Sequence, residues 1–161
     1  MNASISPLIK IIELNTHLFK NSFECVDDKL AQTRINDKTN SMLFIACHLL
    51  DARYYLANKI DAKIECPFQE VFDRATCIDD FAEYPALDDI KASWLDISEI
   101  ITTQLKRVTD DTLYSQSPFP LPIVEPTIFG FITFIAEHES YHIGQLGFLR
   151  KYFGLEPMKY A

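Results

Sequence analysis

The hydrophobic positions of the chain recur with the period of an α-helix in four long segments. The clearest is residues 85–108, where apolar residues return every three or four positions, acids stand near the start and bases near the end. This spacing places one apolar stripe along a helix, and the charges complement the helix dipole. The same period predicts helices over residues 6–24, 38–60 and 126–153.

Two long connections separate the predicted helices. Residues 61–84 hold scattered aromatic residues without a sustained period, so we expect a connection with one short helix there. Pro118, Pro120 and Pro122 alternate in the second connection, which predicts an extended path. Gly154 is expected to end the last helix, because glycine readily adopts the left-handed conformation that follows a helix.

The pattern as a whole predicts an all-α protein. The chain contains only four glycines, too few for a hairpin-rich β architecture. Four helices that each carry one apolar stripe most simply close as a four-helix bundle. A chain of 161 residues suits one domain, so we predict a single domain over residues 1–161.

The charge, the hydropathy and the cysteines of the chain limit the partners and the cellular location that we expect. The net charge of −8 and the lack of a basic cluster argue against nucleic-acid binding. No apolar run is long enough for a membrane span, and the first ten residues lack the features of a signal peptide. We therefore expect a cytoplasmic protein without nucleic-acid or membrane partners. Cys25, Cys47, Cys66 and Cys77 form no C-x-x-C pair, so free thiols are expected.

Three of the four histidines are candidate metal ligands. His138 and His142 are spaced i, i+4, which places them about 40° apart on one face of a helix, in an apolar setting. His48 also lies on an apolar face, and a neighbouring helix could bring it to the same ion. Three imidazoles with an open position are typical of a catalytic site for zinc or nickel. The alternative is a set of hydrogen-bonded core histidines, the role expected for His17.

The segment from His138 to His142 also matches the H-E-x-x-H pattern of zinc peptidases. The longer metzincin pattern fails, because Gln145 stands where glycine is required and Phe148 where histidine is required. A peptidase also needs a substrate cleft with an edge strand, which an all-helical chain lacks. Peptidase activity is therefore disfavoured.

Two segments resemble the DinB/YfiT-like metalloenzymes. The run H-E-S-Y-H-I-G-Q-L, from His138 to Leu146, resembles the signature H-x-x-Y-H-x-G-Q-L on the last helix of that family. The segment from Leu43 to Ala52 is similar to its second helix, where one histidine followed by leucine supplies the first ligand. Length, helix order and motif positions agree over nearly the whole chain.

The resemblance implies a four-helix bundle with up-down-down-up topology, a three-histidine site near one end of it, and a homodimer. Characterised relatives include thiol-dependent S-transferases and an isomerase that uses a low-molecular-weight thiol. The family name implies no DNA chemistry. The resemblance therefore adds a low-molecular-weight thiol as an expected co-substrate.

The leading hypothesis is a metal-dependent enzyme in which His48, His138 and His142 hold Zn²⁺ or Ni²⁺. Such a metal lowers the pKa of a water or thiol, which then attacks a small molecule by transfer or hydrolysis. The alternative is a non-enzymatic, stress-related protein that binds metal or dimerises.

Three further residues of the last helix are candidates for a catalytic role. Glu139 flanks the histidines, where it would transfer protons or else be a solvated surface acid. Gln145 and Tyr141 lie closer to the ligand face, where each would contact a ligand or the substrate. For Tyr141, simple packing is an equally good interpretation.

Overall fold

The computed structural model describes residues 4–73, 83–117, 120–123 and 125–160, and every regular element in these ranges is a helix. The prediction of an all-α fold is confirmed. None of the described helices is both long and apolar enough to cross a membrane. The four long helices are α1 (Ser6–Ser22), α3 (Met42–Lys59), α5 (Leu87–Leu105) and α7 (Ile128–Tyr152), and the short ones are α2 (Asp28–Gln32), α4 (Gln69–Phe72) and α6 (Asp110–Leu113).

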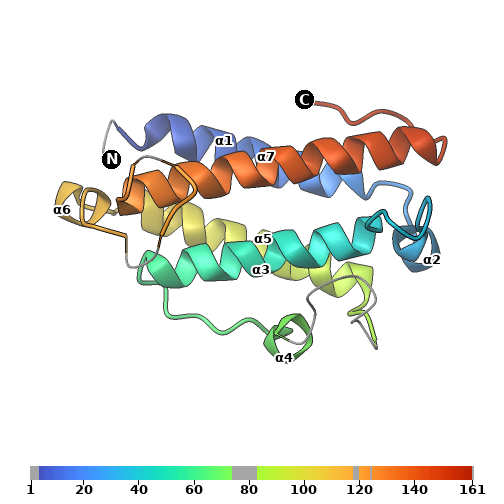
Figure 1. Cartoon of the computed structure of the whole chain (residues 1–161), viewed down its shortest axis with the longest axis horizontal. Coiled ribbons are helices and arrows are strands. Elements are labelled where there is room, and N and C mark those ends of the chain that lie inside the picture. Colours follow the sequence, from blue (N-terminus) through green and yellow to red (C-terminus); the bar gives the residue numbers. More distant parts are fainter. Residues whose placement is uncertain (1–3, 74–82, 118–119, 124, 161) are drawn as a thin grey trace.

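The long helices pack side by side around one apolar core (Figure 1). Helices α1 and α7 run in one direction, and α3 and α5 run in the other. The main contacts of α3 are with α5 and α7, and those of α1 are with the same two helices. Trp94 of α5 is fully buried and stacks on Phe19 of α1, with ring centroids 4.0 Å apart. Because α3 and α7 are neighbours, side chains from both can meet along their shared groove.

Polar side chains define where several helices begin. The hydroxyl of Ser41 accepts a hydrogen bond from the Phe44 amide at the start of α3, and Thr127 accepts one from Gly130 at the start of α7. Asp27 caps α2 in the same way. The predicted end of the last helix is confirmed, because Gly154 adopts a left-handed conformation with φ of 74°.

The connection before α7 is held against the first turn of that helix. The Ser117 amide donates to the Pro126 carbonyl at 2.8 Å, and the Ile128 amide donates to the Ser115 carbonyl at 3.0 Å. A Cβ atom on Gly130 would lie 2.0 Å from the Glu125 carbonyl oxygen, so only glycine permits this approach. Pro120 and Pro122 lie in non-helical backbone of this connection, as predicted, while Pro118 lies outside the described residues.

The described cysteines are free thiols, as expected. Cys25 is exposed, Cys47 and Cys66 are buried, and Cys77 lies outside the described residues. Burial raises the pKa of the Cys47 thiol to about 12 and that of Cys66 to about 11. Both buried thiols are therefore protonated at neutral pH, which makes them poor nucleophiles.

Candidate metal centre

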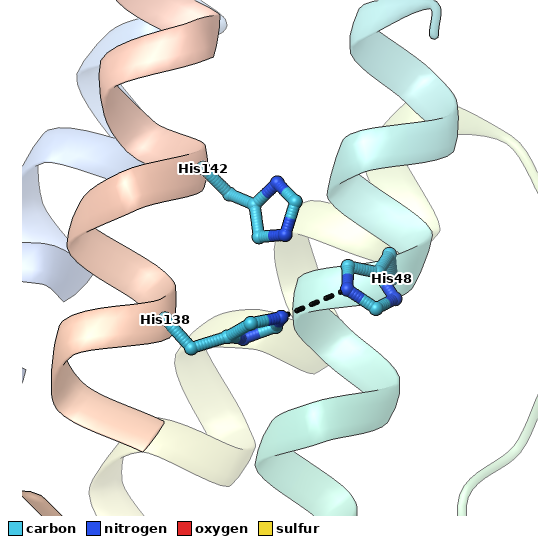
Figure 2. Close-up of side chains that lie close together, drawn as sticks. All are labelled: His48, His138 and His142. Atoms are coloured by element: carbon cyan, nitrogen blue, oxygen red, sulfur yellow. Dashed lines mark hydrogen bonds between the residues drawn. The ribbon is translucent and has the colours of Figure 1, made fainter. Parts of the chain in front are cut away.

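The structure brings the three candidate ligands together in the groove between α3 and α7 (Figure 2). His138 and His142 project from adjacent turns of α7 towards α3, where His48 lies. One potential ligand atom from each histidine lies within 4.8 Å of the other two. The fold therefore brings His48 to the same point as His138, which follows it by 90 positions in the sequence, and His142.

The three rings meet edge to face and share a single hydrogen bond. The ring centroids of His48 lie 4.9 Å from those of His138 and 4.8 Å from those of His142, and the last two are 4.6 Å apart. The Nε2 atoms of His48 and His138 are 2.9 Å apart, so one of them donates a proton to the other. One hydrogen bond thus links the three rings, and the remaining nitrogen lone pairs of the cluster are available to a metal ion.

The surroundings keep the imidazoles of His48 and His138 neutral. Desolvation of its ring lowers the pKa of His48 to about 4 although the residue reaches the surface, and the charge that His138 and His142 would carry lowers it further. Burial, followed by the proximity of His142, likewise lowers the pKa of His138 to about 4. At neutral pH both rings are therefore deprotonated, which is the form that binds a metal.

The hydrogen bond to the outer ring nitrogen of His142 also suits a metal site. The Nδ1 atom of His142 lies 2.8 Å from the Gln145 side-chain oxygen, which accepts its proton and leaves Nε2 as the free donor atom. The Nδ1 atom of His138 is the only buried side-chain nitrogen or oxygen without a hydrogen-bond partner in the described residues. Three imidazoles with incomplete hydrogen bonding fit a divalent cation, since one ion accepts a lone pair from each ring.

The cluster lies at the surface of the groove, and here the sequence-based interpretation needs correction. His48 was expected on an apolar face directed at the core, yet it is exposed, and His138 and His142 are half-buried. Tyr55, which shares a face of α3 with His48, is 44% exposed. The cluster also lies at the middle of α7 (Ile128–Tyr152), whereas the resemblance implied a site near one end of the bundle.

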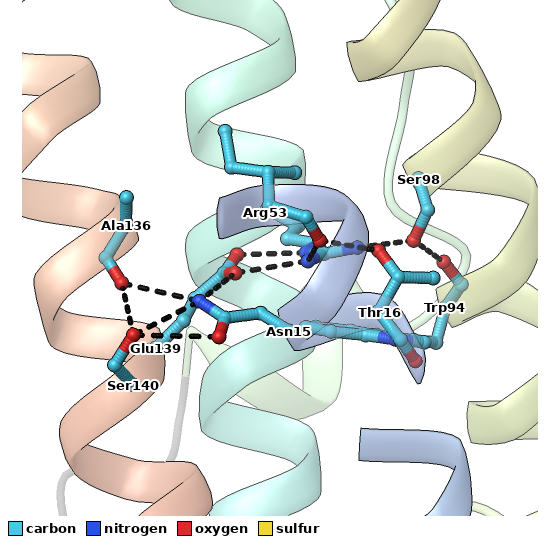
Figure 3. A network of polar contacts seen from close by, with 9 residues as sticks. Asn15, Thr16, Arg53, Trp94, Ser98, Ala136, Glu139 and Ser140 are labelled. Atoms are coloured by element: carbon cyan, nitrogen blue, oxygen red, sulfur yellow. Dashed lines mark hydrogen bonds and ion pairs between the residues drawn. The ribbon is translucent and has the colours of Figure 1, made fainter. Parts of the chain in front are cut away.

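Glu139 points into the core, towards Arg53 of α3 (Figure 3). Its side chain is fully buried, and its two carboxylate oxygens accept hydrogen bonds from Arg53 of α3 at 2.7 and 2.9 Å. Consecutive helix positions differ by about 100°, which is why Glu139 and its neighbour His138 face different surroundings. The interpretation of Glu139 as a solvated surface acid is therefore wrong.

The Arg53–Glu139 ion pair is embedded in a network that reaches all four long helices (Figure 3). Arg53 donates to the Thr16 hydroxyl of α1 at 2.8 Å and to the Ser98 hydroxyl of α5. Its guanidinium carbon lies 3.5 Å from the ring centroid of Trp94. The amide of Asn15 donates to Glu139 at 3.3 Å. With these partners the buried charges are satisfied.

Sequence reasoning missed Arg53 as the partner of Glu139, although a signal was present. Arg53 follows the buried pair Leu49 and Leu50 by one helical turn, so its charge occupies a core position of α3. Glu139 occupies such a position on α7, four residues from Ile135 and from Ile143. A charged residue on an apolar stripe needs a buried partner of opposite charge.

The two other candidates lie beside the cluster, and neither catalytic role is tested by the geometry. Gln145 contacts His142 as described above. Tyr141 is 60% exposed, and its ring centroid is 5.1 Å from that of His142 in an edge-to-face arrangement. Tyr141 therefore borders the exposed side of the histidine cluster.

Two hollows continue the groove on either side of the histidines. The first, of about 480 Å³, lies between α7 and residues 35–40 and includes Lys38 and Gln145; we call it the Lys38 hollow. The second, of about 250 Å³, lies between α3, α7 and residues 120–122 and includes His48 and Asp51; we call it the Asp51 hollow. Burial, with a smaller contribution from Asp73, raises the pKa of Asp51. The candidate metal centre is thus accessible to small molecules.

Comparison with known proteins supports the fold. No family model and no curated protein matches the chain. Among solved structures, the chain is similar to YjoA, a DinB-like protein from Bacillus subtilis. The TM-score is 0.64, and the match covers 98% of this chain and 96% of that one at 16% sequence identity. The protein therefore has the DinB-like fold, and the predicted resemblance is confirmed at the level of the fold.

Proposed function

We propose that the protein is a metal-dependent enzyme with the DinB-like fold, in which His48, His138 and His142 hold one divalent metal, Zn²⁺ or Ni²⁺. The observation that carries this proposal is the convergence of three imidazoles whose potential ligand atoms lie within 4.8 Å of one another. Nitrogen ligands suit zinc and nickel better than calcium or magnesium.

An open, three-ligand arrangement favours catalysis over a purely structural role. Structural zinc sites normally have four protein ligands and no free position, whereas catalytic sites have three. The bound metal would supply a Lewis acid that lowers the pKa of a water or thiol. We therefore propose transfer of a thiol to a small molecule, or hydrolysis of that molecule, with a low-molecular-weight thiol as the co-substrate of the transfer reaction.

The protein's own residues would orient this chemistry. Gln145 holds the His142 ring in the tautomer that leaves Nε2 free. The buried Arg53–Glu139 ion pair joins α3 to α7, the two helices that carry the ligands, and so holds the ligands at a constant separation. In this account Glu139 is a positioning residue and takes no direct part in proton transfer.

A homodimer is part of the proposal. Tyr141, Phe148 and Tyr152 of α7 are 60%, 63% and 56% exposed, so the helix presents a row of aromatic side chains to its surroundings. Exposed apolar patches of this kind mark interaction surfaces. Analytical ultracentrifugation should show a dimer at micromolar concentration, and a monomer under these conditions would contradict it.

The test of enzymatic function compares two histidine variants. Protein loaded with zinc or nickel is assayed for thiol consumption against a panel of small electrophiles, and for hydrolysis of small esters and amides. We expect turnover that His142→Ala abolishes and His17→Ala retains, because His17 lies on α1 outside the cluster and its ring bonds to the Lys159 carbonyl. Fully loaded protein without turnover would favour the non-enzymatic, metal-binding alternative.

A further inference from the structure

The Asp51 hollow is a direct extension of the candidate metal centre. On α3, Asp51, Ala52 and Tyr55 follow His48 by three, four and seven positions, so they continue its face of the helix. On α7, Phe134 precedes His138 by one turn, and their ring centroids are 5.9 Å apart. A molecule bound at the histidines would therefore have this hollow immediately beside it.

The chemistry of the Asp51 hollow selects against negative charge. Most of its lining is apolar, including Phe131, Phe134, Ile135 and Leu121, and Asp51 supplies the one carboxyl group among the described residues that line it. A carboxylate or phosphate placed in it would lose hydration and would face the carboxyl group of Asp51. An uncharged ring or short alkyl group would instead bury apolar surface against the aromatic side chains.

The size and the walls of the hollow limit what it can hold. Its volume of about 250 Å³ is below the range typical for whole drug-sized ligands, so it suits one ring or a short chain. The wall made by residues 120–122 belongs to the connection whose ends are joined by the Gln116–Thr127 bridge and the Ser117 to Pro126 hydrogen bond. Pairing at both ends shortens the free loop that forms this wall.

The Lys38 hollow on the other side of the cluster has a different character. It includes the ammonium group of Lys38 together with Thr39, Asn40 and Gln145, and no carboxylate is part of its lining. The two hollows therefore differ in the sign of their charged group. An anionic group of a ligand would be favoured on the Lys38 side only.

We propose that the Asp51 hollow binds an uncharged aromatic or short aliphatic group of a small molecule whose metal-binding end lies at His48, His138 and His142. This inference rests on the proposed function, and it specifies the substrate class: an electrophile or thiol with an apolar, uncharged substituent next to its reacting atom.

Three metal-binding probes that differ in one substituent test the proposal. Cobalt-loaded protein is titrated calorimetrically with acetohydroxamic acid, benzohydroxamic acid and 4-carboxybenzohydroxamic acid. Burial of the phenyl ring should make benzohydroxamic acid bind about tenfold more tightly than acetohydroxamic acid. 4-Carboxybenzohydroxamic acid should lose this tenfold gain in affinity. In Asp51→Asn, about half of the lost gain should return on a logarithmic scale of affinity.

Two matched phenylalanine variants locate the ring. Phe134→Ala should weaken benzohydroxamic acid about fivefold and leave acetohydroxamic acid unchanged. Phe129→Ala removes an equally half-buried ring on the same helix that packs against Tyr114 and not the hollow, so both affinities should stay the same. Nuclear Overhauser contacts between the probe ring and Phe134 provide a readout independent of affinity.

The outcomes separate this proposal from the proposed function. Equal affinities of the first two probes for the wild type would overturn the Asp51 hollow as a binding site and would leave the metal centre intact. An equal loss of affinity for benzohydroxamic acid in Phe129→Ala and Phe134→Ala would also overturn the Asp51 hollow as a binding site. Failure of the protein to bind cobalt would overturn the metal centre, and the assignment of the hollow with it.

Discussion

Helices α3 and α7 carry two polar clusters that differ in almost every physical property. In the Arg53–Glu139 cluster both side chains are fully buried, and each charged group is hydrogen-bonded. In the histidine cluster the side chains are exposed or half-buried, one hydrogen bond links the rings, and one nitrogen is unpaired. His138 and Glu139 are adjacent in sequence and belong to different clusters.

This difference indicates which cluster stabilises the fold and which one is available to bind a ligand. A buried ion pair with all its hydrogen bonds made has nothing left to offer a ligand, and removing one partner leaves an uncompensated charge. The histidine cluster presents lone pairs that the rest of the chain does not satisfy. We therefore expect substitutions in the first cluster to change stability, and those in the second to change metal binding.

The largest effect is expected from breaking the buried ion pair. Glu139→Leu should lower the free energy of unfolding by about 3–5 kcal/mol, because Arg53 would remain buried without its counter-charge. Urea denaturation of the metal-free protein measures this loss. In the double variant Arg53→Met/Glu139→Leu most of the stability should return. A loss below about 1 kcal/mol in the single variant would show that the buried ion pair contributes little to the stability of the fold.

A metal-dependent gain in stability is the next largest effect. Zinc at one hundred times its dissociation constant should raise the free energy of unfolding by about 2.7 kcal/mol, because the ion binds the folded state. In His48→Ala this gain should vanish, while the metal-free stability changes little, since His48 is exposed. The same zinc-induced gain in wild type and His48→Ala would show that the ion binds elsewhere.

Gln145 should have a smaller effect, on metal affinity alone. Gln145→Ala removes the acceptor for the His142 Nδ1 proton and should weaken zinc binding about tenfold. Gln145→Glu keeps an acceptor at that position and should bind zinc at least as well as the wild type. Competition with a chromophoric chelator measures both constants. Equal weakening in the two variants would argue against the role of this hydrogen bond.

The smallest effect is expected at Tyr141. Its side chain is 60% exposed and touches the edge of the His142 ring, so Tyr141→Ala should change zinc affinity less than about twofold and stability by less than about 0.5 kcal/mol. The same competition and denaturation experiments apply. A tenfold loss of zinc affinity would move Tyr141 from the border of the site into the metal centre.

Most of the fold was predictable from the sequence, because the long helices have strong apolar periodicity. The predicted segments 6–24, 38–60, 85–108 and 126–153 correspond to α1, α3, α5 and α7 within a few residues at each end. The short helix expected between residues 61 and 84 is α4. Helices α2 and α6 were missed, because four or five residues are too few to show a period, although Asp27 and Thr109 cap them.

The site was predictable only in part. The i, i+4 spacing of His138 and His142 is a local property, so their shared face followed from the sequence. The depth of the cluster did not, because it depends on how α3 and α7 rotate against each other. The same holds for Glu139, whose burial depends on Arg53 from a distant part of the chain, and for the hollow beside Asp51, whose other walls come from α7 and residues 120–122.

Metal content of the untagged protein tests the central claim most directly. Inductively coupled plasma mass spectrometry is applied to the wild type, to His48→Ala, to His138→Ala/His142→Ala and to His17→Ala as the control. We expect about one equivalent of zinc or nickel in the wild type and in His17→Ala, and loss of it in the other two. A wild type without metal, even after reconstitution, would contradict the account and leave three unligated histidines in a helical bundle.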